Sequence, residues 1–314
     1  MQLGFPVSVL GRPRLKSHDA RRWQNKPHLS VSLLYLRDIL EYLHNQDIHL
    51  YRMSPYLAPY HSHPDLLQFH GQIEECAGEL AHVGQIARAY GIRLSFHATP
   101  YTTLSSPDPA LVQKSRADLL GWARILDGMQ LGPEAVIILH LGGRYDNPEA
   151  SKARFVAECA KLPPAVRSRL ALENDDSIYS LADVLEVAHK VQLPVAFDNL
   201  HFLNHNPEGM ELAPALEAVW KTWPAGVRPK LHFASARTEM KPARSDQADG
   251  ALRSPNWTEH ADFVNPFEFI AFIRLLPALD NIDIMLEARA KDLAVMRLRA
   301  DLERFAPDLF AAGA

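Results

Sequence analysis

The chain has 314 residues, with 33 Lys and Arg against 37 Asp and Glu, a formal net charge of −4 and 47% hydrophobic residues. This balance is typical of a globular protein and argues against a generally basic nucleic-acid binder, although it does not exclude a local basic face. No stretch approaches the ~20 consecutive apolar residues that a membrane helix needs. Two cysteines, Cys76 and Cys159, are too few for a disulfide framework, so we expect a cytoplasmic protein.

Short apolar runs alternate with amphipathic segments along the chain. The apolar runs are mostly rich in Val, Ile, Leu and Phe, as expected of parallel strands that are buried on both faces. Strands are predicted over residues 3–7, 49–54, 93–98, 136–142, 170–174, 195–201, 230–235 and 282–288. Helices are predicted over residues 33–45, 68–90, 110–128, 148–161, 181–191, 213–220, 266–275 and 293–305. Asp108-Pro109 and Asn265-Pro266 mark the starts of the third and seventh helices.

This alternation predicts an α/β protein with a single (β/α)8 TIM barrel, formed as one domain by residues 1–314. A doubly wound sheet is the alternative, but its phosphate-binding glycine fingerprint is missing after the first strand. Two connections are long, at residues 8–30 and 236–265. Long loops in compact domains are usually functional or disordered.

Imidazole and carboxylate side chains occur at or near the ends of six successive predicted strands. They are His97, His140, Glu173, Asp198 with His201, His232 and Glu287. In a parallel barrel the carboxyl ends of the strands meet at one rim, where active sites are built. A lone buried His is more often a hydrogen-bonded structural residue, but burying so many of these groups together is costly without cations. Mixed nitrogen and oxygen ligands suit Zn or Mn, and a carboxylate such as Glu173 can bridge two ions, so a multinuclear metal site is predicted.

The first long loop has six basic residues and one acidic residue between positions 12 and 26. Composition alone fits a solvated loop as well as a phosphate-binding one. Because the loop follows the first strand, it must border the rim, and we expect Arg14, Arg21 and Arg22 to contact phosphates. Trp23 is expected either to stack on a base or to hold the loop in place.

Two smaller features also belong to the predicted rim. Lys230 shares a strand face with His232, because side chains alternate along a strand with a period of two. Residues 142 and 143 are glycines that permit close approach to a phosphate, and Arg144 and Tyr145 follow them. A Gly-Gly pair alone is a weak signal.

These segments together resemble the UV-damage DNA endonuclease family, which is related in fold to the metal-dependent apurinic endonucleases of the endonuclease IV type. The matching segments are 51–54, Pro59, 63–64, 95–97, 139–143, 172–176, 197–201, 230–235, 260–262 and 287–288. The most specific are Leu-Glu-Asn-Asp-Asp at 172–176 and Asp-Asn-Leu-His at 198–201. The match follows the family's order over nearly the whole chain.

The resemblance implies a repair endonuclease that nicks double-stranded DNA 5′ to pyrimidine dimers and 6-4 photoproducts, and at abasic sites, leaving 3′-hydroxyl and 5′-phosphate ends. It implies a centre of two or three divalent ions, with Mn preferred and Zn, Mg or Co as alternatives. The ligands carried over are His97, His140, Glu173, Asp198, His201, His232, His260 and Glu287. Glu173 is also carried over as a catalytic residue. Lys230 corresponds to a lysine that can be carboxylated beside the metals, and His63 to a histidine near the scissile phosphate. We expect a monomer that binds damaged DNA and no membrane.

The sequence departs from the family after the third predicted strand. The family commonly has His-Pro-Gly-Gln-Tyr there, and its Gln and Tyr probe the lesion, whereas residues 97–101 here read His-Ala-Thr-Pro-Tyr. Tyr101 is therefore the expected lesion probe, with Pro100 in place of the Gln. Phe5 also stands where a Tyr is usual. The metal chemistry should be unaffected, but lesion recognition should differ in detail.

Two other functions are consistent with parts of the pattern. A sugar isomerase or epimerase of the xylose-isomerase-like barrel type also collects Glu, Asp and His around divalent metals, but usually with fewer ligands. A non-catalytic protein that binds damaged DNA is the second alternative, and the complete ligand set argues against it. Nicking of irradiated plasmid compared with isomerisation of ketoses distinguishes the enzymes.

Overall fold

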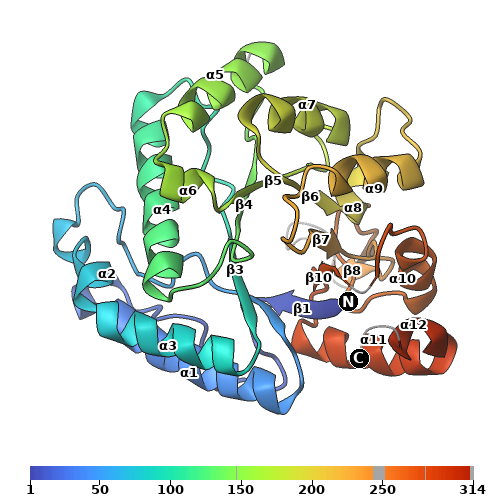
Figure 1. The fold of residues 1–314 in the computed structure, drawn as a ribbon, viewed down its shortest axis with the longest axis horizontal. Helices are drawn as coiled ribbons and strands as arrows, with labels where there is room; N and C mark the ends of the chain where they lie inside the picture. The colour runs from blue at the N-terminus through green and yellow to red at the C-terminus, as the bar shows by residue number, and fades with distance from the viewer. Residues whose placement is uncertain (146, 243–251, 280, 312–314) are drawn as a thin grey trace.

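The structure is a computed structural model that describes residues 1–145, 147–242, 252–279 and 281–311. Parallel strands close into a barrel in the order β1-β10-β7-β6-β5-β4-β3-β2. Their bounds are β1 Gln2–Pro6, β2 Leu50–Arg52, β3 Arg93–His97, β4 Ile137–His140, β5 Leu170–Glu173, β6 Val195–Asp198, β7 Lys230–Phe233 and β10 Asp283–Leu286. Helices surround these strands (Figure 1), so the predicted (β/α)8 barrel is confirmed and the doubly wound alternative is wrong.

The α-helices lie between the strands and after the last one. Their bounds are α1 Leu29–Asn45, α2 Gln72–Glu75, α3 Ala77–Ala89, α4 Pro109–Gly128, α5 Pro148–Ala160, α6 Pro164–Arg167, α7 Leu181–Val191, α8 Asn199–Asn204, α9 Leu212–Trp220, α10 Pro266–Ile273, α11 Asp292–Phe305 and α12 Pro307–Ala311. None of these helices is both long and apolar enough to cross a bilayer.

Side-chain caps explain where several helices begin. The Asp108 carboxylate accepts the amide of Ala110, and Asn265 accepts amides of the first turn of α10, so both predicted start signals are confirmed. Helix α1 begins four residues before its predicted start. The reason is that the His28 side chain accepts the Ser30 amide and caps the extra turn.

The predicted sixth strand, 195–201, ends early. The Asp198 carboxylate accepts the amide of His201 at 2.9 Å and thereby caps the short helix α8. His201 therefore lies on a helical turn instead of a strand. The turn still leaves its side chain on the rim, because α8 follows β6 directly.

The predicted helix over 68–90 is divided into a 3-10 turn, Leu67–Phe69, and helices α2 and α3. At Cys76 the backbone leaves the helical region, with φ −98° and ψ 21°. The side chain of Gln72 accepts the Leu29 amide at 2.8 Å and donates to the Pro59 carbonyl at 2.6 Å. These bonds hold α2 against neighbouring loops, so it does not continue straight into α3.

Apolar side chains fill the space between strands and helices and also part of the barrel interior. The interior cluster consists of Val136, Ile138, Ala171, Ala196 and Trp223. Since side chains alternate along a strand, Ala171 and Glu173 share the inward face, with Glu173 one step nearer the carboxyl end. Packed apolar groups therefore lie below the polar rim.

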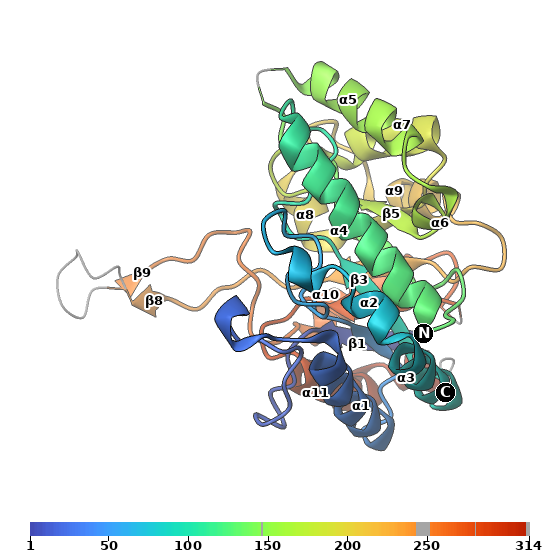
Figure 2. The same ribbon diagram turned by 90° about the vertical axis from the view of Figure 1, so that its left-hand side faces the viewer.

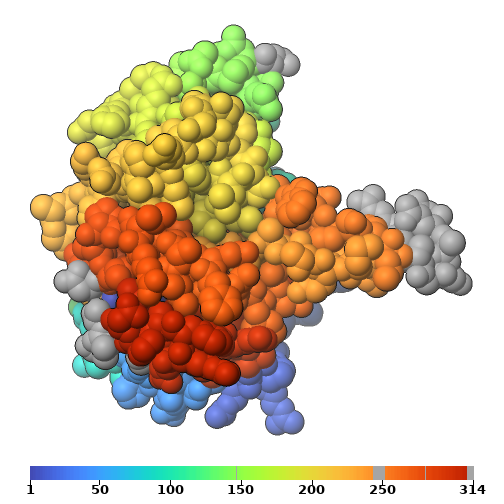
Figure 3. Space-filling view, turned by 90° about the vertical axis from the view of Figure 1, so that its right-hand side faces the viewer, coloured from blue at the N-terminus to red at the C-terminus, as the bar shows by residue number. Residues whose placement is uncertain are grey.

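The two long connections lie outside the barrel wall. The loop after β1 contains a 3-10 turn, Trp23–Asn25. The loop after β7 carries the antiparallel pair β8, Lys241–Pro242, and β9, Leu252–Arg253. In Figures 2 and 3 this β8–β9 segment projects away from the body of the barrel.

Candidate metal centre and its rim

The parallel register brings the carboxyl ends of the strands together. His140 on β4 is the neighbour of Glu173 on β5, and Asp198 on β6 is the neighbour of His232 on β7. Glu287 immediately follows β10, whose Met285 pairs with His232. The convergence predicted for these side chains is therefore present in the structure.

Glu173 lies at the middle of the group and is 1% exposed. Its Oε2 is 2.7 Å from His97 Nε2 and 3.4 Å from His140 Nε2. Its Oε1 is 2.7 Å from His232 Nδ1 and 3.6 Å from His201 Nδ1. Both carboxylate oxygens thus face imidazole nitrogens, one pair on each side.

Asp198 and Glu287 bring two more carboxylates to the same rim. His232 Nδ1 lies 3.3 Å from Glu287 Oε1 and 4.0 Å from Asp198 Oδ2. His260, on the loop that follows β7, places its Nδ1 3.8 Å from Glu287 Oε2. Two sets of donor atoms lie within 4.8 Å of one another: His97, Glu173 and His232, and Glu173, Asp198, His232 and Glu287.

Backbone carbonyls orient three of the histidines. The Nδ1 atoms of His97, His201 and His260 donate to the carbonyls of Ala98, Asn174 and Glu287, at 2.7, 2.9 and 2.7 Å. A proton held on Nδ1 leaves the Nε2 lone pair available to a metal ion, which is the usual arrangement around metal-binding histidines. Asn174 also exchanges two hydrogen bonds with the backbone of Asp198.

Several buried polar atoms at this rim have no hydrogen-bond partner among the described residues. They are His140 Nδ1, Asp198 Oδ2 and His232 Nε2. An unsatisfied buried polar atom costs about 1–3 kcal/mol. Divalent cations would satisfy the carboxylate oxygen and balance the buried negative charge, and the mixed nitrogen and oxygen donors suit Mn or Zn. The residues present therefore fit a metal centre.

The electrostatics follow from packing carboxylates and imidazoles together. Burial alone would raise the pKa of Glu173, but His232, His140 and His97 hold it well below its usual range. Burial opposes the charged form of His201, yet Asp198 and Glu173 outweigh it and raise the pKa of His201 to about 9. Burial lowers the pKa of His140. The Glu173 carboxylate is thus ionised, as a metal ligand must be.

Lys230 shares the inward face of β7 with His232 and is 1% exposed. Its Nζ lies 3.8 Å from Asp283 Oδ2, and no hydrogen bond to it is found within the described ranges. Burial lowers the pKa of Lys230 to about 8. A buried lysine with this pKa is neutral far more often at physiological pH than a solvated one.

Arg52 at the end of β2 is a rim residue absent from the predicted site. Its guanidinium forms an ion pair with Glu287, and both side chains are nearly buried. It therefore fixes one oxygen of a candidate ligand. The sequence could have indicated Arg52, because it lies near the end of the second predicted strand and within the matching segment 51–54.

The basic loop approaches the rim from the β1 side. His18 Nδ1 lies 3.1 Å from the Ser54 hydroxyl, just after β2. Arg14, Arg22 and Trp23 are exposed. Arg21 differs from them, because its guanidinium is bound to the buried carboxylate of Asp19 at 2.6 Å. Arg21 thus helps to hold the loop.

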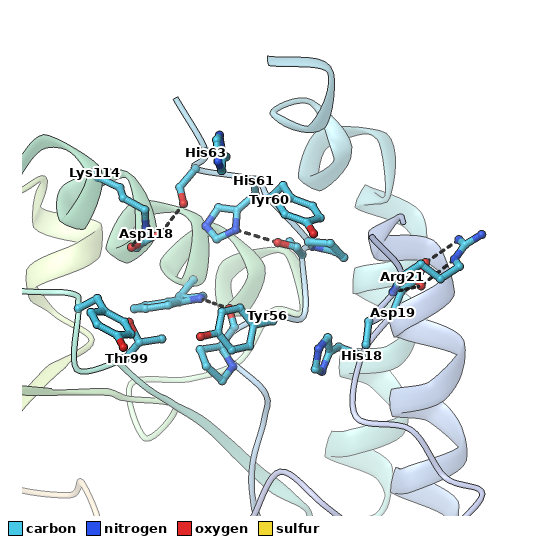
Figure 4. Close-up of a pocket in the computed structure, with 17 residues that line it drawn as sticks. His18, Asp19, Arg21, Tyr56, Tyr60, His61, His63, Thr99, Lys114 and Asp118 are labelled. Carbon is cyan, nitrogen blue, oxygen red and sulfur yellow. Dashed lines mark hydrogen bonds and ion pairs between the residues drawn. The ribbon is translucent and has the colours of Figure 1, made fainter. Parts of the chain in front are cut away.

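A cavity of 480 Å³ is lined by the loops that follow β1, β2 and β3 and by α4 (Figure 4). His18, Asp19 and Arg21 line one side, and Thr99, Lys114 and Asp118 line the other. His63 is on the wall of this cavity, and among the described residues no hydrogen bond or ion pair joins it to the candidate metal ligands. Tyr101 also lines the cavity and is 77% exposed.

The loop after β4 carries the last predicted contact residues. Gly142 has φ +93°, and a Cβ there would lie 2.1 Å from the Thr103 hydroxyl, so glycine is required. Arg144 and Tyr145 are exposed, and the Arg154 guanidinium lies 5.6 Å from the centre of the Tyr145 ring. Both residues follow β4 on the rim side, and neither of them lines the 480 Å³ cavity.

The barrel and its rim of imidazoles and carboxylates define an enzyme with its active site at the carboxyl end of the strands. A family model described as UV-endonuclease UvdE matches residues 16–308, so the chain belongs to this family. Its membership confirms the predicted family and the predicted class of enzyme, a UV endonuclease.

Known proteins are similar over most of the chain. The UV DNA damage endonuclease of Bacillus velezensis is 30% identical over 279 residues, covering 87% of this chain and 82% of that protein. The UV DNA damage endonuclease of Halalkalibacterium halodurans is 30% identical over 284 residues, covering 89% and 81%. The crystal structure of SacUVDE has a TM-score of 0.80 at 28% identity and covers 97% of this chain and 98% of that chain.

Sugar epimerases share the fold alone. The D-psicose 3-epimerase of Clostridium cellulolyticum H10 has a TM-score of 0.56 at 12% identity, with 99% of each chain covered. At this identity the likeness extends to the barrel architecture and carries no statement about activity. The isomerase alternative therefore has only this architectural support.

Proposed function

We propose that this chain incises double-stranded DNA on the 5′ side of UV photoproducts and at abasic sites, leaving 3′-hydroxyl and 5′-phosphate ends. The observation that carries the proposal is Glu173, a buried carboxylate with imidazole nitrogens 2.7 Å from each of its two oxygens. The UV DNA damage endonucleases that the chain resembles supply the substrate class. The chain acts as a monomer in this proposal.

Glu173 is the residue best placed to bridge ions. It belongs to both sets of converging donor atoms, one with His97 and His232 and one with Asp198, His232 and Glu287. We assign the remaining ligands, His140, His201 and His260, to the same centre of two or three divalent ions, preferably Mn. Bound ions of this kind lower the pKa of a water molecule and offset negative charge that develops on the phosphate.

Neighbouring side-chain and backbone groups hold the ligands in place. Arg52 fixes Glu287, and the Asn174 carbonyl fixes the ring of His201. Partners of this kind usually contribute 10–100-fold to metal affinity or activity. His63 is assigned to the DNA phosphate side of the site, because it lies on the wall of the 480 Å³ cavity.

Lys230 is assigned as a carboxylated lysine. Carboxylation joins the neutral amine to carbon dioxide and releases one proton, so it requires a lysine of lowered pKa. Burial of Lys230 lowers its pKa to about 8, and its Nζ has no hydrogen-bond partner within the described residues. The new carboxylate would give that buried nitrogen a role beside His232, the candidate ligand that follows it on β7.

Chelation is expected to abolish incision reversibly. The purified protein treated with EDTA should no longer nick irradiated plasmid, and added Mn²⁺ should restore nicking. The melting temperature should also fall on chelation, because removing the ions leaves buried carboxylates unbalanced. Undamaged plasmid is the substrate control. Full nicking by metal-free protein, or turnover of ketoses without nicking, would contradict the proposal.

Neutralising the exposed part of the basic loop is expected to weaken DNA binding without changing damage specificity. In Arg14→Gln/Arg22→Gln the plot of log affinity against log salt should flatten by roughly 0.9 per lost phosphate contact. Arg21 is left intact, because it is bound to Asp19. Arg274→Gln, an exposed arginine after α10, is the control. A change in the preference for damaged duplex at constant salt slope would show that the loop reads the lesion.

A further inference from the structure

Lys291 has a backbone conformation that side chains rarely adopt. It lies between β10 and α11, with φ 54° and ψ −122°. Only glycine adopts this region without steric cost, so a lysine here is strained. Strain of this kind persists where the surrounding structure enforces it, and it clusters at functional sites.

The residue that follows Lys291 holds this connection in place. The next residue, Asp292, is fully buried, and its carboxylate accepts the amides of Leu10 and Gly11 at 2.7 and 2.9 Å. The Tyr42 hydroxyl donates to the same carboxylate at 2.7 Å. Lys291 is therefore held where the start of the basic loop meets the β10–α11 connection.

Lys291 lies four residues after Glu287, in the connection that follows β10 at the carboxyl end of the barrel. Burial lowers the pKa of Lys291, the Arg52 guanidinium lowers it further, and the Glu287 carboxylate raises it. Glu287 already pairs with Arg52 and lies 3.3 Å from His232.

No ion pair or hydrogen bond engages the Lys291 ammonium within the ranges that the structure describes. A half-buried cation without an anionic partner is costly in the free protein. An anion brought by the substrate would remove that cost. DNA offers such anions at every phosphate, and lysine binds phosphate as a point charge.

We propose that Lys291 binds a phosphate oxygen of the DNA strand at the candidate metal centre and is a further substrate-binding residue of this enzyme. The proposal rests on the DNA incision proposed above. It explains why a lysine occupies a position that favours glycine, because a glycine there would relieve the strain but would lack the positive charge that binds the phosphate. It also explains the rigid link between this residue and the basic loop, since both then contact the same strand.

Three substitutions separate charge from strain. Lys291→Gln removes the charge and keeps the strain, whereas Lys291→Gly removes both. Lys291→Arg keeps the charge. Lys221→Gln is the control, because Lys221 is an exposed lysine after α9, at the opposite end of the barrel from the rim.

The measurement is binding of a fluorescent duplex with one thymine dimer, and of its undamaged counterpart, over a series of salt concentrations. Lys291→Gln and Lys291→Gly should both lower affinity for each duplex, by about fivefold, and flatten the salt slope by roughly 0.9. Lys291→Arg should keep the wild-type slope. The melting temperature should be higher for Lys291→Gly than for Lys291→Gln, because glycine relieves the strain.

Wild-type affinity and salt slope in Lys291→Gln would overturn the assignment. A loss of DNA affinity in Lys291→Gly that is accompanied by a fall in melting temperature would also overturn it. Binding and incision are scored separately. A wild-type protein that fails to nick the dimer contradicts the proposed function. The salt slopes of the variants still decide whether Lys291 holds a phosphate.

Discussion

Glu173→Gln is expected to lower the rate of incision at a dimer by more than about 100-fold, above the range usual for residues that only orient ligands. The amide keeps the size of the side chain but removes the negative charge that faces His97 and His232, both at 2.7 Å. Because Glu173 belongs to both groups of converging donors, its loss should affect more than one ion. The amount of metal bound per chain should therefore fall together with the rate.

The rate is measured on a duplex with one dimer, and metal content is measured by mass spectrometry on the same samples. Glu217→Gln on the exposed face of α9 is the matched control and should change neither value. Circular dichroism should show an intact barrel in both variants. Near-normal turnover of Glu173→Gln with its full metal content would remove Glu173 from the centre.

The barrel and the convergence of its polar side chains followed from local patterns. Apolar runs indicated buried parallel strands, and parallel strands bring their carboxyl ends to one rim. His97, His140 and Glu173 each end a strand, so the topology alone placed them together. His201 reached the same rim by α8, a turn that depends on a cap by Asp198 and that strand periodicity does not reveal.

The contacts that sequence reasoning missed join residues far apart in the chain. Arg52 pairs with Glu287, and Asp292 binds the amides of Leu10 and Gly11 across more than 280 residues. Periodicity and composition describe each segment separately, so they do not predict which charged side chains of two segments meet. A counter-ion for a candidate ligand is therefore found only when the fold is known.

The basic loop shows that composition also fails to predict contacts between charged residues that are close in the sequence. Composition gave Arg14, Arg21 and Arg22 equal standing as phosphate contacts, because all three lie in one basic run. In the structure all three arginines are exposed, but the guanidinium of Arg21 is bound to the buried carboxylate of Asp19. The single acidic residue of the run thus decides which arginine is already engaged.

Tyr101→Ala is expected to lower incision at dimers by about tenfold or more, with metal content unchanged. The ring is 77% exposed, so it contributes little to packing in the free protein. Its backbone is held firmly, since the amide of Thr102 donates to the Thr99 carbonyl at 2.9 Å and Thr103 bonds to Ser115. Stacking on a base is worth about 1–3 kcal/mol, and about 1.4 kcal/mol corresponds to a tenfold change in rate.

Two roles for the exposed Tyr101 ring, as a lesion probe and as a packing residue, predict different results. A ring that stacks in the gap left by displaced bases should matter most at a dimer, and Tyr101→Phe should retain most of the rate because it keeps the aromatic face. A ring that only supports its loop should lower the melting temperature and reduce incision equally at dimers and abasic sites. Rates on both substrates and the melting temperature, measured on the same variants, distinguish the two roles, and an unchanged dimer rate in Tyr101→Ala excludes Tyr101 as the probe.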